Sequence, residues 1–365
     1  MDATSERAEK KKPDGEGVRP AAAIKRASLS RGRLPAEHYV QGILRGDRSA
    51  LAQAITLIES SRAVDREIAE QVVEHCLGRS GNAIRLGITG VPGAGKSSLI
   101  EALGKHIILE RDETVAVLAV DPTSRVSGGS ILGDKTRMRF LATSERAFIR
   151  PSPTRCAQGG VAQHTREAML LCEAAGYRNV LVETVGVGQS EVTVRDMVDF
   201  FLLVAIAGAG DELQGIKRGV MELVDAVVVN KADGDNVRAA ERARIEVENA
   251  LHFLPQSISG WAARALACSA YTGYRVADLW TCVLEHHAMT MSNDWLPRLR
   301  LEQNRSWMQA TLEQGLMQLF RSNPVIQSHM VELEERVLAG QITAVRAGRE
   351  LLSLYVSMNK VKGLQ

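Results

Sequence analysis

The residues best suited to chemistry lie at 90–98, where Gly-Val-Pro-Gly-Ala-Gly-Lys-Ser-Ser follows a short apolar run and precedes a helical pattern. The spacing G-x-x-x-x-G-K-[ST] is typical of a phosphate-binding loop, because glycines let backbone N–H groups face phosphates and the helix N-terminus adds its positive dipole end. We expect Lys96 to reach the β- and γ-phosphates and the Ser97 hydroxyl to ligate Mg²⁺. The nucleotide-binding residues predicted in this loop are Gly90, Val91, Pro92, Gly93, Ala94, Gly95, Lys96, Ser97 and Ser98.

A second polar group follows the Val-rich run 226–230, where the chain reads Asn-Lys-Ala-Asp at 230–233. The Asp carboxylate of such a loop can accept hydrogen bonds from N1 and N2 of guanine, which adenine does not offer in that arrangement. An ordinary turn is the alternative, but the preceding strand and the upstream phosphate loop favour base recognition. The next expected strand ends in Cys-Ser-Ala, which matches the accessory loop under the base. We therefore predict GTP and GDP as ligands, held by Asn230, Lys231, Asp233, Ser269 and Ala270.

Three carboxylates are candidates for the metal side of the site. Glu183 ends an apolar run and is followed three residues later by Gly186, an arrangement that can hold Mg²⁺ through water. Asp121 and Asp134 flank a Gly/Ser-rich loop, which suggests a first switch that brings a carboxylate to Mg²⁺, although Asp134 could instead cap the following helix. We predict Ser97 and these three carboxylates as metal ligands. Gln189 could orient the attacking water, or it could simply begin a helix.

Strands and helices must alternate to position these loops. Uninterrupted Val/Ala/Leu runs indicate parallel strands that are covered on both faces. A helical period links the runs, and ligands of such sheets bind at the carboxyl ends of the strands. We predict an α/β fold, a P-loop NTPase with a mostly parallel central sheet. The expected strands are 84–90, 114–120, a short one ending at 149, 180–183, 200–206, 226–230 and 265–269.

The periodicity also divides the chain into segments. Residues 1–34 have almost no large apolar side chains, so we predict a disordered tail. Apolar positions at helical spacing predict two or three N-terminal helices in 35–80 and a wholly helical arm at 297–365, on either side of a nucleotide domain at 81–296. Trp307, Leu312, Leu316 and Leu319 fall on one stripe of that arm, which favours a homodimer; the alternative is that the stripe folds back on the nucleotide domain.

Composition narrows the class of protein. The formal net charge of +2 over 365 residues gives no argument for nucleic acid as a partner. No apolar run approaches the roughly 18 residues needed to span a membrane. The five cysteines form no C-x-x-C pair and read as reduced thiols, so we expect a cytoplasmic protein without a membrane partner.

A series of ordered motifs resembles one known family. The motifs are G-V-P-G-A-G-K-S, A-V-D-P-T-S, G-G-S-I-L-G-D-K-T-R-M, R-P-S-P, M-L-L-C-E-A-A-G-Y, V-E-T-V-G-V-G-Q-S-E, G-D-E-L-Q-G-I-K and N-K-A-D. Together they resemble the MeaB/ArgK family of GTPases, closely over residues 36–300 and loosely in the helical C-terminus. The resemblance implies a homodimeric GTPase of the SIMIBI class that serves as chaperone of an adenosylcobalamin-dependent acyl-CoA mutase, gating cofactor loading and protecting the enzyme.

The same resemblance assigns two further elements. Residues 208–217 match the third switch of the family, whose lysine, here Lys217, is tied to activation of GTP hydrolysis by the mutase. The helical C-terminus matches a dimerisation arm. At 154–158 the chain reads Thr-Arg-Cys-Ala-Gln where relatives typically carry Ser-Ser-Gly, so a residue with a side chain replaces a permissive glycine in a loop that could contact the partner. Methylmalonyl-, isobutyryl-, ethylmalonyl- and 2-hydroxyisobutyryl-CoA mutases are equally acceptable as clients.

Other functions remain as alternatives. A metal-insertion GTPase of the urease or hydrogenase maturation type would share the fold and the Glu-x-x-Gly motif. That class usually carries a His-rich or Cys-containing metal site, whereas only His286 and His287 are adjacent among the eight histidines here. A kinase of amino-acid transport is a weaker alternative, because no residue pattern suggests a base for a protein hydroxyl.

Overall fold

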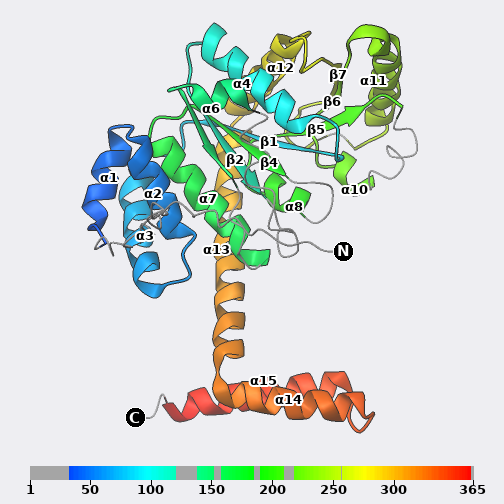
Figure 1. Cartoon of the computed structure of the whole chain (residues 1–365). Coiled ribbons are helices and arrows are strands. Elements are labelled where there is room, and N and C mark those ends of the chain that lie inside the picture. Colours follow the sequence, from blue (N-terminus) through cyan, green and yellow to red (C-terminus); the bar gives the residue numbers. More distant parts are fainter. Residues whose placement is uncertain are drawn as a thin grey trace, which may run out of the picture. The chain divides into compact units, whose positions relative to one another are not determined.

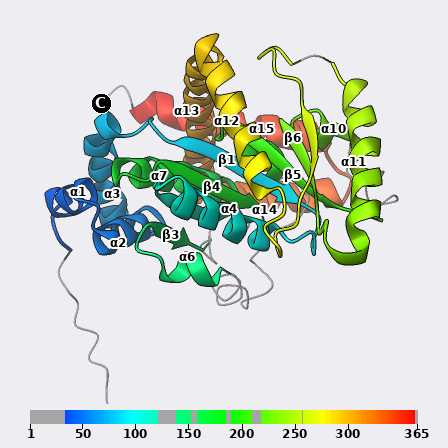
Figure 2. The same ribbon diagram turned by 90° about the horizontal axis from the view of Figure 1, so that it is seen from above.

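The computed structural model describes residues 33–120, 138–151, 158–184, 190–208, 218–255 and 257–362. Within these ranges seven strands form one sheet, in the order β3-β2-β4-β1-β5-β6-β7 (Figure 1, with β3 labelled in Figure 2). Their bounds are β1 Ile84–Gly90, β2 Val115–Val120, β3 Ala147–Arg150, β4 Asn179–Thr184, β5 Phe200–Ile206, β6 Ala226–Asn230 and β7 Arg264–Ala267. Every neighbouring pair is parallel, which confirms the predicted fold class.

The sheet is buried on both faces. Strands β4 and β6 are buried along their whole length, and β5 is buried up to Ile206, as near-continuous apolar strands require. Helices α4 and α12 cover one face of the sheet, and α7 and α8 cover the other (Figures 1 and 2). The helices that alternate with the strands are α4 Lys96–Glu110, α6 Arg139–Thr143, α7 Gln158–Ala174, α8 Ser190–Arg195, α10 Arg218–Met221, α11 Val237–His252 and α12 Val276–Ser292.

Three α-helices precede the sheet, as the apolar spacing predicted. They are α1 Ala36–Leu44, α2 Arg48–Ile58 and α3 Ala63–Cys76, followed by the 3₁₀ turn Leu77–Arg79. The Asp47 side chain caps α2, accepting hydrogen bonds from the Ser49 and Ala50 N–H groups at 2.8 and 3.3 Å. Helices α2 and α3 pack against α7, so the N-terminal helices share a core with the sheet domain.

The C-terminal segment is helical, as expected, but it consists of separate helices. They are α13 Trp295–Ser322, α14 Pro324–Leu338 and α15 Ala344–Lys362. Helix α13 begins before the expected start of the arm at 297, and Pro297 is tolerated because the first turn of a helix needs no N–H donor. The Asn323 side chain caps α14 by accepting hydrogen bonds from Val325 and Ile326 N–H. Helix α14 then packs against α13 and α15.

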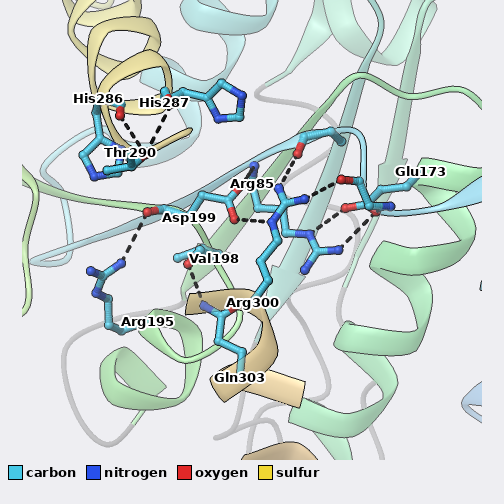
Figure 3. A network of polar contacts seen from close by, with 12 residues as sticks. Arg85, Glu173, Arg195, Val198, Asp199, His286, His287, Thr290, Arg300 and Gln303 are labelled. Atoms are coloured by element: carbon cyan, nitrogen blue, oxygen red, sulfur yellow. Dashed lines mark hydrogen bonds and ion pairs between the residues drawn. The ribbon is translucent and has the colours of Figure 1, made fainter. Parts of the chain in front are cut away.

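Side chains on the first turns of α13 anchor this helix to the amino edge of the sheet (Figure 3). The Arg300 guanidinium donates two hydrogen bonds to the buried Asp199 carboxylate at 2.9 and 2.6 Å, and a third to the Ala83 carbonyl at 2.7 Å. The Gln303 amide donates to the Val198 carbonyl at 2.9 Å. A bidentate Arg–carboxylate pair in buried surroundings holds the start of the helix in one orientation.

Several sequence-based boundaries differ from the structure by one or two residues; for example, β2 begins at Val115 rather than at 114, and β4 spans Asn179–Thr184 rather than 180–183. Strand β7 ends at Ala267 rather than at 269, because the chain turns there and Ser269 N–H donates to the Tyr274 carbonyl at 3.0 Å. Most of the expected tail lies outside the described residues. In the described part of the chain, no helix combines the length and the apolar character that a membrane crossing requires.

Candidate functional site

The phosphate-binding loop runs from the end of β1 into α4. Gly90 has φ +149°, and a Cβ added there would lie 2.2 Å from the Val204 carbonyl oxygen. Gly95 has φ +89°, and a Cβ there would lie 2.6 Å from Asn230 Nδ2. Both positions therefore require glycine, the first for close packing on β5 and the second for contact with the Asn-Lys-Ala-Asp loop.

Lys96, Ser97 and Glu183 come together at the start of α4. The Lys96 ammonium donates to the Gly90 carbonyl at 2.8 Å and to the Val91 carbonyl at 3.3 Å, so it lies across the loop. The Ser97 hydroxyl donates to Glu183 Oε1 at 2.9 Å, across 86 residues of sequence. All three side chains are buried. A hydroxyl and a carboxylate in contact are oxygen donors of the kind that Mg²⁺ prefers, and the turned loop with its lysine fits a phosphate chain.

Two buried charges influence Lys96. Burial lowers the pKa of its ammonium, while the charges of Glu183 and Glu191 act in the opposite direction and favour the charged form. Glu191, on α8, is 1% exposed. Glu191 was not among the predicted site residues, although it ends the motif V-E-T-V-G-V-G-Q-S-E.

A pair of hydroxyls ties the two strands that carry the site. The Thr184 hydroxyl, next to Glu183 in β4, donates to the Thr89 hydroxyl at 2.9 Å, and both side chains are fully buried. Thr89 directly precedes Gly90 in β1. This contact holds the carboxylate strand in register with the phosphate loop, and no sequence motif indicated it because threonine is common in strands.

Asn230 connects the base-recognition loops to the phosphate loop. Its Nδ2 donates to the Ala94 carbonyl at 2.8 Å, and its Oδ1 accepts from Ala270 N–H at 3.0 Å. The Asn230 side chain is buried. Asn230 and Ala270 were both predicted site residues, and in the structure the Asn230 amide joins the loops that carry Ala94, Asn230 and Ala270.

Asp233 and Ser269 face each other at the outer side of this junction. The Ser269 hydroxyl donates to Asp233 Oδ2, and it accepts a hydrogen bond from Thr272 N–H at 3.1 Å. Lys231 has φ +63°, a strained conformation for a side-chained residue, and the half-buried Asn236 amide braces the turn by donating to the Lys231 carbonyl at 2.7 Å. The hydrogen bond from Ser269 thus holds the Asp233 carboxylate in one direction.

The outcome for the predicted site residues is uneven. The phosphate loop, Glu183 and the base-loop residues converge at the carboxyl edge of β1, β4, β5 and β6. Pro92, Gly93 and Ser98 lie in the same loop but are exposed. Asp121, Asp134, Gln189 and Lys217 lie outside the described residues.

The chain is a P-loop GTPase. This class is defined by the parallel sheet, the Gly-Lys-Ser loop and the Asn-Lys-x-Asp loop, whose Asn230 is hydrogen-bonded to the phosphate loop. Residues 51–325 match the family described as "Methylmalonyl Co-A mutase-associated GTPase MeaB". The chain belongs to this family. It binds guanine nucleotide and hydrolyses GTP.

Known relatives agree with this assignment. The chain is 46% identical over 278 residues to GTPase ArgK of Escherichia coli, a match covering 76% of this chain and 84% of the relative. It is 40% identical over 326 residues to the mouse protein named "Methylmalonic aciduria type A homolog, mitochondrial", covering 87% and 78%. A crystal structure of a protein named LAO/AO transport system kinase superposes with TM-score 0.71 at 35% identity, covering 88% of this chain and 97% of that one.

Proposed function

We propose that this GTPase is the chaperone of an adenosylcobalamin-dependent acyl-CoA mutase, methylmalonyl-CoA mutase or a close relative, and that it gates cofactor loading and protects the mutase. The match of residues 51–325 to the mutase-associated family carries this proposal. The name of the mouse relative, which refers to methylmalonic aciduria, supports it. We place the protein in the cytoplasm; the described cysteines are free and buried, in keeping with a reducing compartment.

The proposed roles in hydrolysis follow from the positions of the side chains. Lys96 lies across the phosphate loop and would neutralise the β- and γ-phosphates, and Asn230 and Asp233 would hold the guanine base. The magnesium ligands are proposed to be Ser97 and Glu183, joined by Asp121 and Asp134 from outside the described residues. Bound Mg²⁺ would supply charge neutralisation at the phosphates.

Activation by the partner is proposed to act through Gln189 and Lys217. A positive charge supplied to a P-loop GTPase is worth about 10³–10⁵ in rate. We therefore expect slow intrinsic hydrolysis, which the mutase accelerates by ordering the segment 208–217 so that Lys217 acts on the γ-phosphate side directly or by ordering Gln189.

The test is GTP turnover with and without purified methylmalonyl-CoA mutase. Lys217→Ala should keep the basal rate and lose the stimulation, whereas Lys105→Ala, an exposed lysine on α4, should keep both. Full stimulation of Lys217→Ala would remove the third switch from the mechanism. If neither this mutase nor the other acyl-CoA mutases stimulate the unmutated protein, the client proposal is wrong.

We also propose that the C-terminal helices form a homodimer. Leu312, Leu316 and Leu319 are 57%, 61% and 60% exposed. Trp307, from the same predicted stripe, instead packs under the Arg166 guanidinium, whose Cζ lies 5.3 Å from the centroid of the Trp307 ring. Exposed leucines repeated along one helix face are suited to a second copy of the same helix.

Light scattering should therefore give twice the 39.7 kDa chain mass. Leu312→Glu with Leu316→Glu should give a monomer that still hydrolyses GTP. Val64→Glu is the matched control, because Val64 is 61% exposed on α3, and it should stay dimeric. A monomeric unmutated chain would contradict the proposal.

A further inference from the structure

A cavity of about 600 Å³ opens at the amino edge of the sheet, away from the nucleotide site. It lies between the end of α1, the 3₁₀ turn after α3, and the segment that joins α7 to β4. The phosphate loop follows the other end of β1. Seven residues of strand at about 3.3 Å each separate the two ends by roughly 20 Å, so the two sites are distinct.

The cavity is lined by three exposed arginines, Arg45, Arg79 and Arg178. Within the part of the chain that the structure describes, none of the three guanidinium groups makes a hydrogen bond or an ion pair, although backbone groups of Arg45 and Arg178 do. An arginine normally finds a carboxylate when one is within reach, because the bidentate pair is favourable. Three unpaired guanidinium groups around one concavity create a positive field that is not cancelled locally.

The single carboxylate in the lining, Glu173, does not offset this charge. It is buried at the end of α7, and the Arg85 guanidinium donates to it at 2.6 and 3.1 Å (Figure 3). The Gly81 N–H donates to the same carboxylate. Since Glu173 is already matched by Arg85, the cavity keeps the full charge of its three arginines.

The walls between the charges are suited to an organic body. Leu44 is 44% exposed at the rim, and Tyr177 forms part of the wall. Burial raises the pKa of the Tyr177 phenol to about 12, with the charge of Arg48 opposing, so the phenol stays neutral near pH 7 and adds no negative charge. A volume of this size falls within the range of small-molecule sites, about 300–1,000 Å³.

We propose that this cavity is a second ligand site, which binds a small organic molecule carrying two or more phosphate groups. The planar guanidinium of arginine matches phosphate oxygens in bidentate geometry, and three of them around one cavity suit a ligand with separated phosphates. The concave wall favours a small molecule over the flat surface of a protein partner. The site is separate from the GTPase centre and goes beyond the proposed chaperone function.

The test uses the full-length protein with excess GDP and Mg²⁺, so that the nucleotide site is filled. Adenosine 3′,5′-bisphosphate and fructose 1,6-bisphosphate are titrated separately by calorimetry. Binding of both means that two phosphates suffice, and binding of the first alone means that the cavity also selects an aromatic body; either result supports the proposal. Absence of heat with both probes at millimolar concentration overturns it.

Matched variants locate the binding. Arg79→Ala with Arg178→Ala should weaken the bisphosphates by at least about tenfold, because charge-assisted contacts are lost. Arg242→Ala, an exposed arginine on α11, should bind them as the unmutated protein does. Both variants should keep the same GTP turnover and thermal unfolding temperature, since none of these side chains makes a described contact. Unchanged bisphosphate affinity in the double variant would show that the ligand binds elsewhere and overturn the proposal.

Discussion

Asn230→Ala should weaken guanine nucleotide binding without dismantling the fold. In the structure the Asn230 side chain is 2% exposed and spans the Ala94 carbonyl at 2.8 Å and the Ala270 N–H at 3.0 Å. Alanine removes both hydrogen bonds, together with the weak one that the Cys268 thiol donates to Asn230 Oδ1 at 3.9 Å, and leaves the Ala94 carbonyl and the Ala270 N–H without their partner. Each such bond contributes about 0.5–1.5 kcal/mol net. Without the two bonds, the phosphate loop and the predicted base loop are no longer held together. We expect the free energy of GDP binding to become less favourable by about 1–3 kcal/mol, the sum of the two bonds.

The expected loss of GDP affinity is therefore about 5- to 150-fold, because 1.4 kcal/mol corresponds to a factor of ten. Displacement of a fluorescent GDP analogue measures it, and thermal unfolding of the nucleotide-free protein measures the cost to the fold. Asn236→Ala is the control: this half-buried amide donates one hydrogen bond within its own loop, to the Lys231 carbonyl at 2.7 Å, so the loss should not exceed that of a single bond, about 0.5–1.5 kcal/mol or about 2- to 13-fold. If Asn230→Ala binds GDP within twofold of the unmutated protein, or if Asn236→Ala loses as much, the reasoning is wrong.

Two further substitutions test the base and a buried carboxyl. Asp233→Asn should weaken GTP binding and favour binding of xanthosine triphosphate, because an amide can donate to O2 of xanthine where the carboxylate cannot. Competition assays measure both affinities. Equal competition by ATP and GTP in the unmutated protein would contradict recognition of guanine. Burial raises the pKa of Glu167 from 4.5 to about 7. The charge of Glu70 adds to this rise, and the hydrogen bond from Gln163 acts in the opposite direction and lowers the pKa. Its ionisation therefore opposes folding, so stability should fall as pH rises from about 4.5 to 7. Glu167→Gln should raise the unfolding temperature by an amount that grows over this window and is constant above it; a gain independent of pH would refute the assignment.

Local patterns in the sequence were sufficient for much of the fold. The strands β1, β5 and β6 were predicted with their observed bounds, because apolar runs of that length between turn residues have few other ways to be buried. The phosphate loop was predictable because its geometry is local: residues Gly90 to Ser97 form one turn, so their types and spacing along the chain are enough to indicate it. The boundaries of β7 and α13 were less predictable, since turns and first helical turns tolerate several residue types.

Contacts between distant residues were decided only by the tertiary structure. The order of the strands brings Thr89 to Thr184 and Ser97 to Glu183, and no local pattern encodes which strands become neighbours. The same holds for the Arg300–Asp199 pair near the start of α13 and for the three arginines that line the cavity at the amino edge of the sheet. The sequence by itself therefore determined the elements and the motifs they carry. The packing of the sheet determined which side chains meet, because hydrogen bonds and charge pairs depend on separations in space that are unrelated to separations along the chain.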